Sequence, residues 1–168
     1  MEKLYILKNR DKYLGNPNLI YYRSSWEHAF LQFLEESPVI TAFNSEEVCI
    51  PYFYPLDKKW HRYYVDFFIE LKHQHHFLIE IKPFYQRIKP FRKKELGTFI
   101  KNQSKWEFAS RYAENKGMQF LVLDEYDLKK MGVRIPINNS KRMVEKKILF
   151  EQRDKYGQSV DRLIKPLL

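Results

Sequence analysis

The sequence is poor in cysteine and has no long hydrophobic run. Its single cysteine, Cys49, cannot form a disulfide within the chain, so a disulfide-rich secreted scaffold is excluded and a reducing compartment is expected. No apolar stretch approaches the roughly 20 residues that cross a bilayer, and residues 1–10 lack the apolar segment of a signal peptide. These absences predict a cytoplasmic protein with no membrane partner. Cys49 lies in an apolar run, where it is expected to fill the core.

Acidic residues are also in deficit. The chain has 21 Asp and Glu against 30 Lys and Arg, which gives a formal net charge of +9. That excess predicts a polyanionic partner, and nucleic acid is the first candidate. Aromatic residues make up 17% of the chain, which suits half-buried strands and surfaces that stack on bases. The length of 168 residues suits one domain with one core.

Apolar residues follow helical and strand periods in the order α-β-β-β-α-β. This order predicts an α/β fold with a mixed central β-sheet flanked by helices. The first helix is expected after Ser24, because Ser24 and Glu27 form a capping box ahead of an apolar stripe that ends at Pro38. The other elements are expected, in chain order, as strands at about 47–54, 61–71 and 77–81, a helix at 95–115 and a strand at 120–123.

The strongest chemical signal is an aspartate followed by a Glu-x-Lys triplet, formed by Asp66, Glu80 and Lys82. If the hairpin loop is centred on His73, paired positions sum to 146 and Asp66 stands across from Glu80. Opposed strand residues have β-carbons about 5 Å apart, so the two carboxylates repel each other. A hard divalent cation relieves that repulsion, and carboxylates with water are the ligands that magnesium prefers. The backbone carbonyl of Ile81 is a further oxygen donor for such a cation.

This arrangement suits metal-assisted phosphodiester hydrolysis. The alternative is a solvated strand face on which Lys82 only pairs with Glu80, since short motifs have many false positives. The otherwise apolar run 77–81 favours a site, because an unpaired charge is costly there. Glu27 is a second candidate carboxylate if its helix begins over the strand face, and otherwise only caps the helix. Gln103 needs a hydrogen-bond partner, which is either the site or solvent at a helix edge.

Basic residues gather directly after the proposed catalytic strand. The segment 82–105 holds eight basic residues and one acidic residue, with aromatic residues interleaved. Basic side chains neutralise phosphates and aromatic rings stack on bases, so this segment is expected to border a DNA-binding cleft. The histidines at 61, 73, 75 and 76 match no standard zinc module, which favours a polar loop over a zinc site. The candidate DNA contacts are Arg23, Arg87, Lys89, Arg92, Lys93, Lys94, Lys101 and Lys105.

Seven short runs, taken in order, resemble a known protein family. They lie at 22–27, 50–52, 55–57, 61–67, 78–83, 102–106 and 117–123. They resemble the head completion nucleases of large tailed phages, a family that is similar in turn to the N-terminal nuclease domain of TnsA-type transposon endonucleases. The resemblance covers about residues 20–132. One departure is Val65, which stands where the family commonly has a proline before the aspartate.

The resemblance implies a restriction-endonuclease-like core and a Mg²⁺-dependent deoxyribonuclease of the PD-(D/E)XK type, with Mn²⁺ as the alternative cation. It implies that the protein processes packaged double-stranded DNA so that the head can join the tail. Portal or neck proteins are then the expected partners, no small-molecule cofactor is expected, and the expected location is the host cytoplasm or the virion. The implied catalytic residues are Glu27, Asp66, Glu80, Lys82 and, in support, Gln103. The implied metal ligands are Asp66, Glu80, the Ile81 carbonyl and Glu27.

Three segments are expected along the chain: an N-terminal arm at 1–22, a nuclease domain at 23–134 and a basic helical extension at 135–168. Two other functions stay open. One is a structural head or connector protein that binds DNA ends without cutting, which the intact Asp-Glu-Lys set disfavours. The other is a transposase-type strand-cleaving subunit, which the lack of room for a second DNA-binding domain disfavours.

Overall fold

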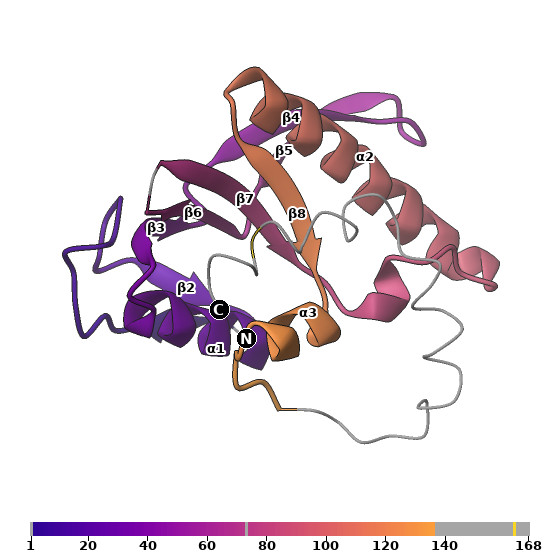
Figure 1. Cartoon of the computed structure of the whole chain (residues 1–168). Helices are drawn as coiled ribbons and strands as arrows, with labels where there is room; N and C mark the ends of the chain where they lie inside the picture. The colour runs from indigo at the N-terminus through magenta and orange to yellow at the C-terminus, as the bar shows by residue number, and fades with distance from the viewer. Residues whose placement is uncertain (1, 73, 137–162, 164–168) are drawn as a thin grey trace.

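The computed structural model describes residues 2–72, 74–136 and 163 (Figure 1). Its central layer is a four-stranded sheet of order β3-β6-β7-β8, in which β8 runs parallel to β7 and the other neighbours are antiparallel. The pairs β1–β2 and β4–β5 form two separate sheets. The elements are β1 (Lys3–Tyr5), β2 (Ile20–Tyr22), α1 (Ser25–Glu36), β3 (Ile40–Ser45), β4 (Cys49–Tyr54), β5 (Lys59–Tyr64), β6 (Phe67–Leu71), β7 (His75–Ile81), the 3-10 turn η1 (Phe84–Gln86), α2 (Lys93–Asn115), β8 (Gln119–Leu123) and α3 (Glu125–Lys130).

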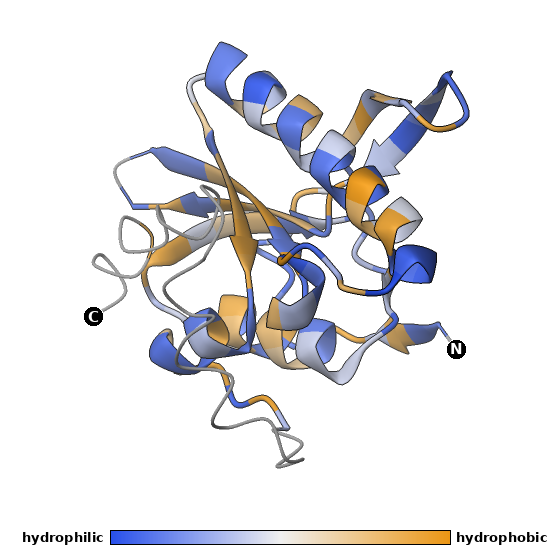
Figure 2. Ribbon diagram, turned by 90° about the vertical axis from the view of Figure 1, so that its right-hand side faces the viewer, coloured by the Kyte–Doolittle hydropathy of each residue, from blue (hydrophilic) through white to orange (hydrophobic). Residues whose placement is uncertain are grey.

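Strand β7 lies inside the central sheet, between β6 and β8, and helices cover both of its faces. Phe77, Ile79 and Ile81 point to one face and join a core cluster with α1 and α3. Leu78 points to the other face and packs in a second cluster with Trp106 of α2 and with the β4–β5 hairpin. Figure 2 shows hydrophobic residues concentrated along the central strands. The mixed sheet flanked by helices that the sequence predicts is therefore present.

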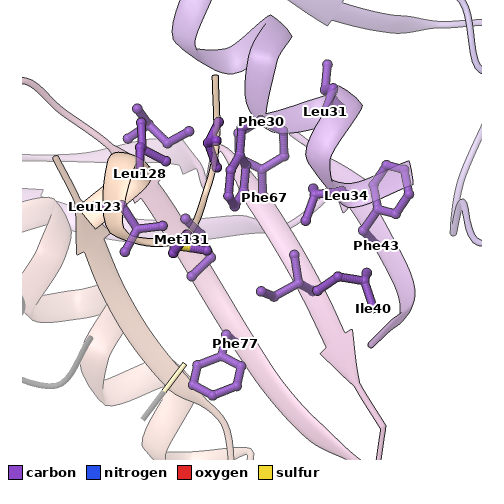
Figure 3. Packing of buried hydrophobic residues seen from close by; sticks show 14 of the residues in the cluster. Phe30, Leu31, Leu34, Ile40, Phe43, Phe67, Phe77, Leu123, Leu128 and Met131 are labelled. Carbon is purple, nitrogen blue, oxygen red and sulfur yellow. The ribbon is translucent and has the colours of Figure 1, made fainter. Parts of the chain in front are cut away.

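Helix α1 begins where its capping residues predict. The Ser24 side chain accepts a hydrogen bond from the Glu27 N–H, while the Glu27 carboxylate accepts from the Arg23 N–H and from the Ser24 hydroxyl. In the expected capping box Glu27 would accept from the Ser24 N–H, but here it accepts from the N–H of the preceding residue, Arg23. The helix buries one apolar face, where the centroid of the Phe30 ring lies 5.0 Å from that of the Phe67 ring in the sheet (Figure 3).

Two expectations, one for a strand and one for Cys49, are wrong. The single strand expected at 61–71 is two strands, because the chain leaves the β4–β5 hairpin at Val65 and enters the central sheet at Phe67. Cys49 is exposed instead of filling the core. In β4 the alternation turns Ile50 and Tyr52 inward, so Cys49 and the other odd positions point outward.

Residues 2–22 pack into the domain and do not extend from it as an arm. Tyr5, Leu7, Tyr13 and Ile20 are buried in the first core cluster. The antiparallel pairing of β1 with β2 places Tyr5 opposite Ile20, and the Tyr13 ring packs edge-on against Phe43 of β3. Most of the expected C-terminal extension lies outside the described residues. No helix in the described part of the chain has the length and apolarity of a bilayer span.

Candidate active site

The β6–β7 hairpin fixes the place of the proposed catalytic residues. All its paired positions sum to 146, as the sequence predicts. The ladder ends with Phe67 opposite Ile79, one step before Asp66, which lies in the bend between β5 and β6. Asp66 Oδ2 accepts a 2.8 Å hydrogen bond from the Ile81 N–H. This bond holds the Asp66 carboxyl against the end of β7, beside Glu80.

The bend that carries Asp66 has its own backbone support. Val65 donates its N–H to the carbonyl of Val48 at 3.0 Å, and Glu46 donates to the carbonyl of Asp66 at 3.2 Å. A proline has no N–H to donate. The valine at this position, where the resembled family commonly has proline, therefore makes a hydrogen bond that proline could not.

Glu80 is almost fully excluded from water, with 2% of its surface exposed. Its Oε2 accepts a 2.6 Å hydrogen bond from the Tyr63 hydroxyl, and its Oε1 lies 2.8 Å from Lys82 Nζ. Each oxygen of the Glu80 carboxylate thus has its own partner, Tyr63 or Lys82. Sequence reasoning missed Tyr63, although the alternation along β5 turns this residue inward two positions before Val65.

The electrostatics of the site reflect two acids held close together with little water. Burial raises the pKa of the Asp66 carboxyl well above its ordinary value, and the Glu80 charge raises it further, against the opposing effects of Lys82 and the Ile81 N–H. Burial acts to lower the pKa of Lys82, but the charges of Glu80 and Asp66 outweigh it, so the net shift is upward. Burial, and then the same two charges, raise the pKa of Tyr63 well above its usual value.

Glu27 lies within electrostatic reach of this cluster. Its charge raises the pKa of Asp66 and that of Lys82. The Glu27 oxygens themselves accept the hydrogen bonds that cap α1, and no described contact joins them to Asp66 or Glu80, so a role for Glu27 as a metal ligand stays a prediction.

Lys105, which the sequence indicates only as a DNA contact, also belongs to the site. Its Nζ lies 5.1 Å from the centroid of the Tyr63 ring and 5.8 Å from that of Tyr52. Burial lowers the pKa of Lys105, and the Glu80 charge partly opposes this shift. Helix α2 thus places a second lysine, in addition to Lys82, where the charges of Glu80 and Asp66 act on it.

Gln103 is half-buried on α2. In the described part of the chain the two strand carboxylates are held by Tyr63, Lys82 and the Ile81 N–H, and Gln103 is not among these partners. Its supporting role stays a prediction.

Arg87 is not a DNA contact, and that prediction is wrong. Its side chain is fully buried and pairs with Asp124 at 2.6 Å and with Asp127 at 3.4 Å. Both partners belong to the start of α3, where Asp124 is the N-cap. A buried guanidinium needs such paired carboxylates, and here the pair ties the segment after η1 to α3.

The other basic candidates remain available on the surface. Lys101 is exposed, and its Nζ lies 5.1 Å from the centroid of the Tyr54 ring. Arg23 is partly exposed and pairs with Glu46 and, at 2.5 Å, with Glu2. The remaining exposed candidates lie between η1 and the first turn of α2 and are Lys89, Arg92, Lys93 and Lys94.

No group of three or more His, Cys, Asp or Glu side chains is gathered to hold a metal within residues 2–72, 74–136 and 163. His61 pairs with Asp57 at 2.8 Å and His76 with Glu70 at 3.1 Å, away from the carboxylate cluster. The donors in the cluster itself are carboxylate oxygens, which are ligands that a hard cation such as Mg²⁺ prefers. Two acids buried together, one with a raised pKa, fit a site that gains from added positive charge.

Comparisons with known proteins identify the family of the chain. Residues 37–125, which carry Asp66, Glu80 and Lys82, match the family described as TnsA-like endonuclease N terminal. The chain is 34% identical over 142 residues to the protein named "Head completion nuclease" of Enterobacteria phage T4, and the match covers 77% of this chain and 95% of that protein. The chain is thus similar to a phage head completion nuclease and belongs to the TnsA-like N-terminal endonuclease family.

Proposed function

We propose that the protein is a Mg²⁺-dependent DNA nuclease of the PD-(D/E)XK type that acts in phage head completion, where it processes packaged DNA before the head joins the tail. The endonuclease family and the similarity to a head completion nuclease support the nuclease role. The observation that carries the chemistry is the placement of Glu80, buried and paired with Lys82, beside an Asp66 whose pKa is raised.

The chain's own groups suggest how a phosphodiester would be held. Tyr63 and the Ile81 N–H fix the carboxyl orientations of Glu80 and Asp66, so the two acids are ready before substrate arrives. Lys82 lies against Glu80 and would stabilise negative charge that develops on the phosphate. A divalent cation bound there would supply Lewis-acid activation of water and phosphate.

The residues that we propose to hold this cation come from three elements. Asp66 and Glu80 would supply carboxylate oxygens, the end of β7 would supply the carbonyl of Ile81, and Glu27 would approach from α1. Mn²⁺ is the alternative ion, because it accepts the same oxygen donors.

Double-stranded DNA is the proposed substrate, and portal or neck proteins are the partners that this role implies. The host cytoplasm and the assembled virion are the proposed locations. The chain spans 95% of the phage relative that it matches, which favours head completion over a transposase-type subunit. A connector that binds DNA without cutting is disfavoured, because the proposed catalytic residues Asp66, Glu80 and Lys82 are all present.

Plasmid cleavage tests the proposal. The wild-type protein should nick or linearise supercoiled plasmid with Mg²⁺ and be inactive with a chelator. Asp66→Ala and Glu80→Ala should each lower the rate by at least about 100-fold. Glu70→Ala is the matched control, because Glu70 lies on the neighbouring strand β6 but pairs with His76, and it should cut normally.

Two results would contradict the assignment. Intact plasmid under all metal and salt conditions would reject a nuclease, and equal cleavage by all variants would reject this site. The assembly role is tested separately by electron microscopy of particles made without the protein, which should show filled heads without tails.

A further inference from the structure

A cavity of about 290 Å³ lies between η1 and the N-terminal half of α2. This volume is at the lower end of the about 300–1,000 Å³ that is usual for small-molecule pockets. It admits one planar ring system and little more. Tyr85, Ile88 and Phe99 line its apolar part, and Gln86, Lys94 and Asn102 line its polar part.

Asn102 is the residue in this cavity that needs explanation. It is 6% exposed on an otherwise apolar face of α2 that also buries Trp106 and Ala109. Its amide makes no hydrogen bond to another described residue and is not fully sealed from solvent, so the open space of the cavity can reach it. An amide that faces a cavity is satisfied when a ligand brings both a donor and an acceptor to it.

The surroundings of the cavity suit a nucleotide. Tyr85 is 56% exposed and Phe99 is half-buried, so both rings can pack against a planar ligand. Lys94 lines the cavity, and the exposed Arg92 and Lys93 precede it on the same turn. An amide, aromatic faces and cations together are the groups that recognise an unstacked base and its phosphate.

The cavity also lies next to the proposed catalytic centre along the chain. η1 begins at Phe84, two residues after Lys82. On the other wall, Asn102 precedes Lys105 by three residues, which is about 4.5 Å along a helix axis. Both walls of the cavity thus continue along the chain into residues of the proposed catalytic centre, which makes a nucleotide next to the scissile phosphate the candidate ligand.

We propose that this cavity takes an unpaired nucleobase beside the scissile phosphate, so the favoured substrate is DNA with an unpaired nucleotide at the cleavage point. The inference rests on the proposed nuclease function and deepens it. The Asn102 amide hydrogen-bonds to the edge of the base, and Tyr85 and Phe99 pack against its faces. A base within a continuous duplex cannot enter, because its edge is paired and its faces are stacked.

The test compares two DNAs with the full-length protein in the presence of a chelator, so that no cleavage occurs. Both are duplexes of equal length and sequence, and one carries a single unpaired 2-aminopurine. The wild-type protein should bind the unpaired DNA about tenfold more tightly than the paired one. The 2-aminopurine fluorescence should fall on binding, because the base stacks on aromatic side chains.

Variants distinguish the cavity from a general preference for flexible DNA. Asn102→Ala and Tyr85→Ala should each reduce the tenfold preference to about twofold without changing affinity for paired DNA. Asn115→Ala, at the far end of the same helix, and Tyr21→Ala, another exposed tyrosine, are matched controls that should keep it. Tyr85 lies on the surface, so its variant stays folded even if Asn102→Ala does not.

Equal affinity of the wild type for both DNAs would overturn the inference, as would a preference that Tyr85→Ala retains. These results leave plasmid cleavage untouched and so would spare the proposed function. Failure to bind either DNA, together with intact plasmid, would reject both.

Discussion

At the scale of single residues, the buried acids dominate the behaviour of this protein. Glu80 is 2% exposed, and Asp66 accepts one backbone hydrogen bond and lies beside a second carboxylate. Burying two like charges together lowers stability, since each loses water and repels the other. Catalytic sites commonly carry such a stability cost, which removal of one charge relieves.

Asp66→Asn should therefore stabilise the protein when a chelator is present. Asn keeps an oxygen for the Ile81 N–H and removes the charge. The raised pKa of Asp66 means that the folded protein binds more protons than the unfolded one above pH 3.8, so wild-type stability falls as pH rises through the shifted pKa. Urea unfolding should show a gain at pH 7, within the about 0.5–2 kcal/mol that single stabilising substitutions give, and this gain should shrink towards pH 4. A loss at pH 7, or a gain independent of pH, would contradict this.

Tyr63→Phe should slow cleavage about 10- to 100-fold while the protein stays folded. The change removes only the hydroxyl that donates to Glu80 Oε2 at 2.6 Å, so the carboxylate loses its fixed orientation. The unfolding free energy should fall by about 1–3 kcal/mol, because a buried acceptor loses its partner. The neighbouring Tyr64→Phe is the control, since Tyr64 is 48% exposed and should cleave at the wild-type rate. An unchanged rate for Tyr63→Phe would refute the positioning role.

At the scale of elements, the residues that cap helix α1 also influence the charge state of the proposed catalytic aspartate. Glu27 is held by the Arg23 N–H and the Ser24 hydroxyl, and the same carboxylate acts on Asp66 through its charge. The geometry that begins the helix therefore also sets the position of a proposed metal ligand.

Ser24→Ala tests that link. Loss of an N-cap side chain costs about 1 kcal/mol, and the Glu27 carboxylate also loses one of its two hydrogen bonds. We expect lower stability in urea. We also expect weaker Mg²⁺ binding, measured as a several-fold higher Mg²⁺ concentration for half-maximal cleavage. Ser25→Ala, in the first position inside the helix, is the control. A stability loss with unchanged Mg²⁺ dependence would separate capping from catalysis.

The elements that sequence could predict are those with a regular period. The β6–β7 register followed from one loop position, because pairing in a tight hairpin is fixed by its turn. Strand β3 escaped notice, since a register irregularity between Ile40 and Ala42 interrupts its alternation. The break between β5 and β6 at Asp66 could not be predicted, because the alternation of buried residues continues without interruption through Tyr63, Val65 and Phe67.

In the candidate site too, residues in one local segment could be predicted, and residues positioned by tertiary packing could not. Asp66, Glu80 and Lys82 are local to one hairpin and could be predicted from spacing. The burial of Arg87 could not, because its partner Asp124 is 37 positions away and reaches it only through the tertiary fold. The location of Lys105 over Tyr63 depends equally on the packing of α2 against the β4–β5 hairpin.

At the scale of the whole molecule, the net charge of +9 must act through residues that face solvent. Lys94→Ala should weaken binding of a chelator-protected duplex and reduce the slope of log affinity against log salt by about 0.9, the value for one phosphate contact. Fluorescence anisotropy between about 50 and 200 mM KCl measures this slope. An unchanged slope would place Lys94 outside the DNA interface.

Arg87→Ala removes the same charge with a different outcome. It removes the buried guanidinium that pairs with Asp124 and Asp127, so stability should fall by about 3–5 kcal/mol. Thermal unfolding measures the loss. A variant as stable as the wild type, with a reduced salt slope, would restore Arg87 as a DNA contact.

The parallel pairing of β7 with β8 has a consequence for biosynthesis. Strand β7 is complete at Ile81, but its second neighbour begins only at Gln119, after the whole of α2. The Lys82 N–H donates to the Leu123 carbonyl, so the reactive end of the strand is closed by the last strand of the sheet. Such non-local pairing forms late. A nascent chain still emerging from the ribosome would thus lack an assembled cutting centre until most of its length had been translated.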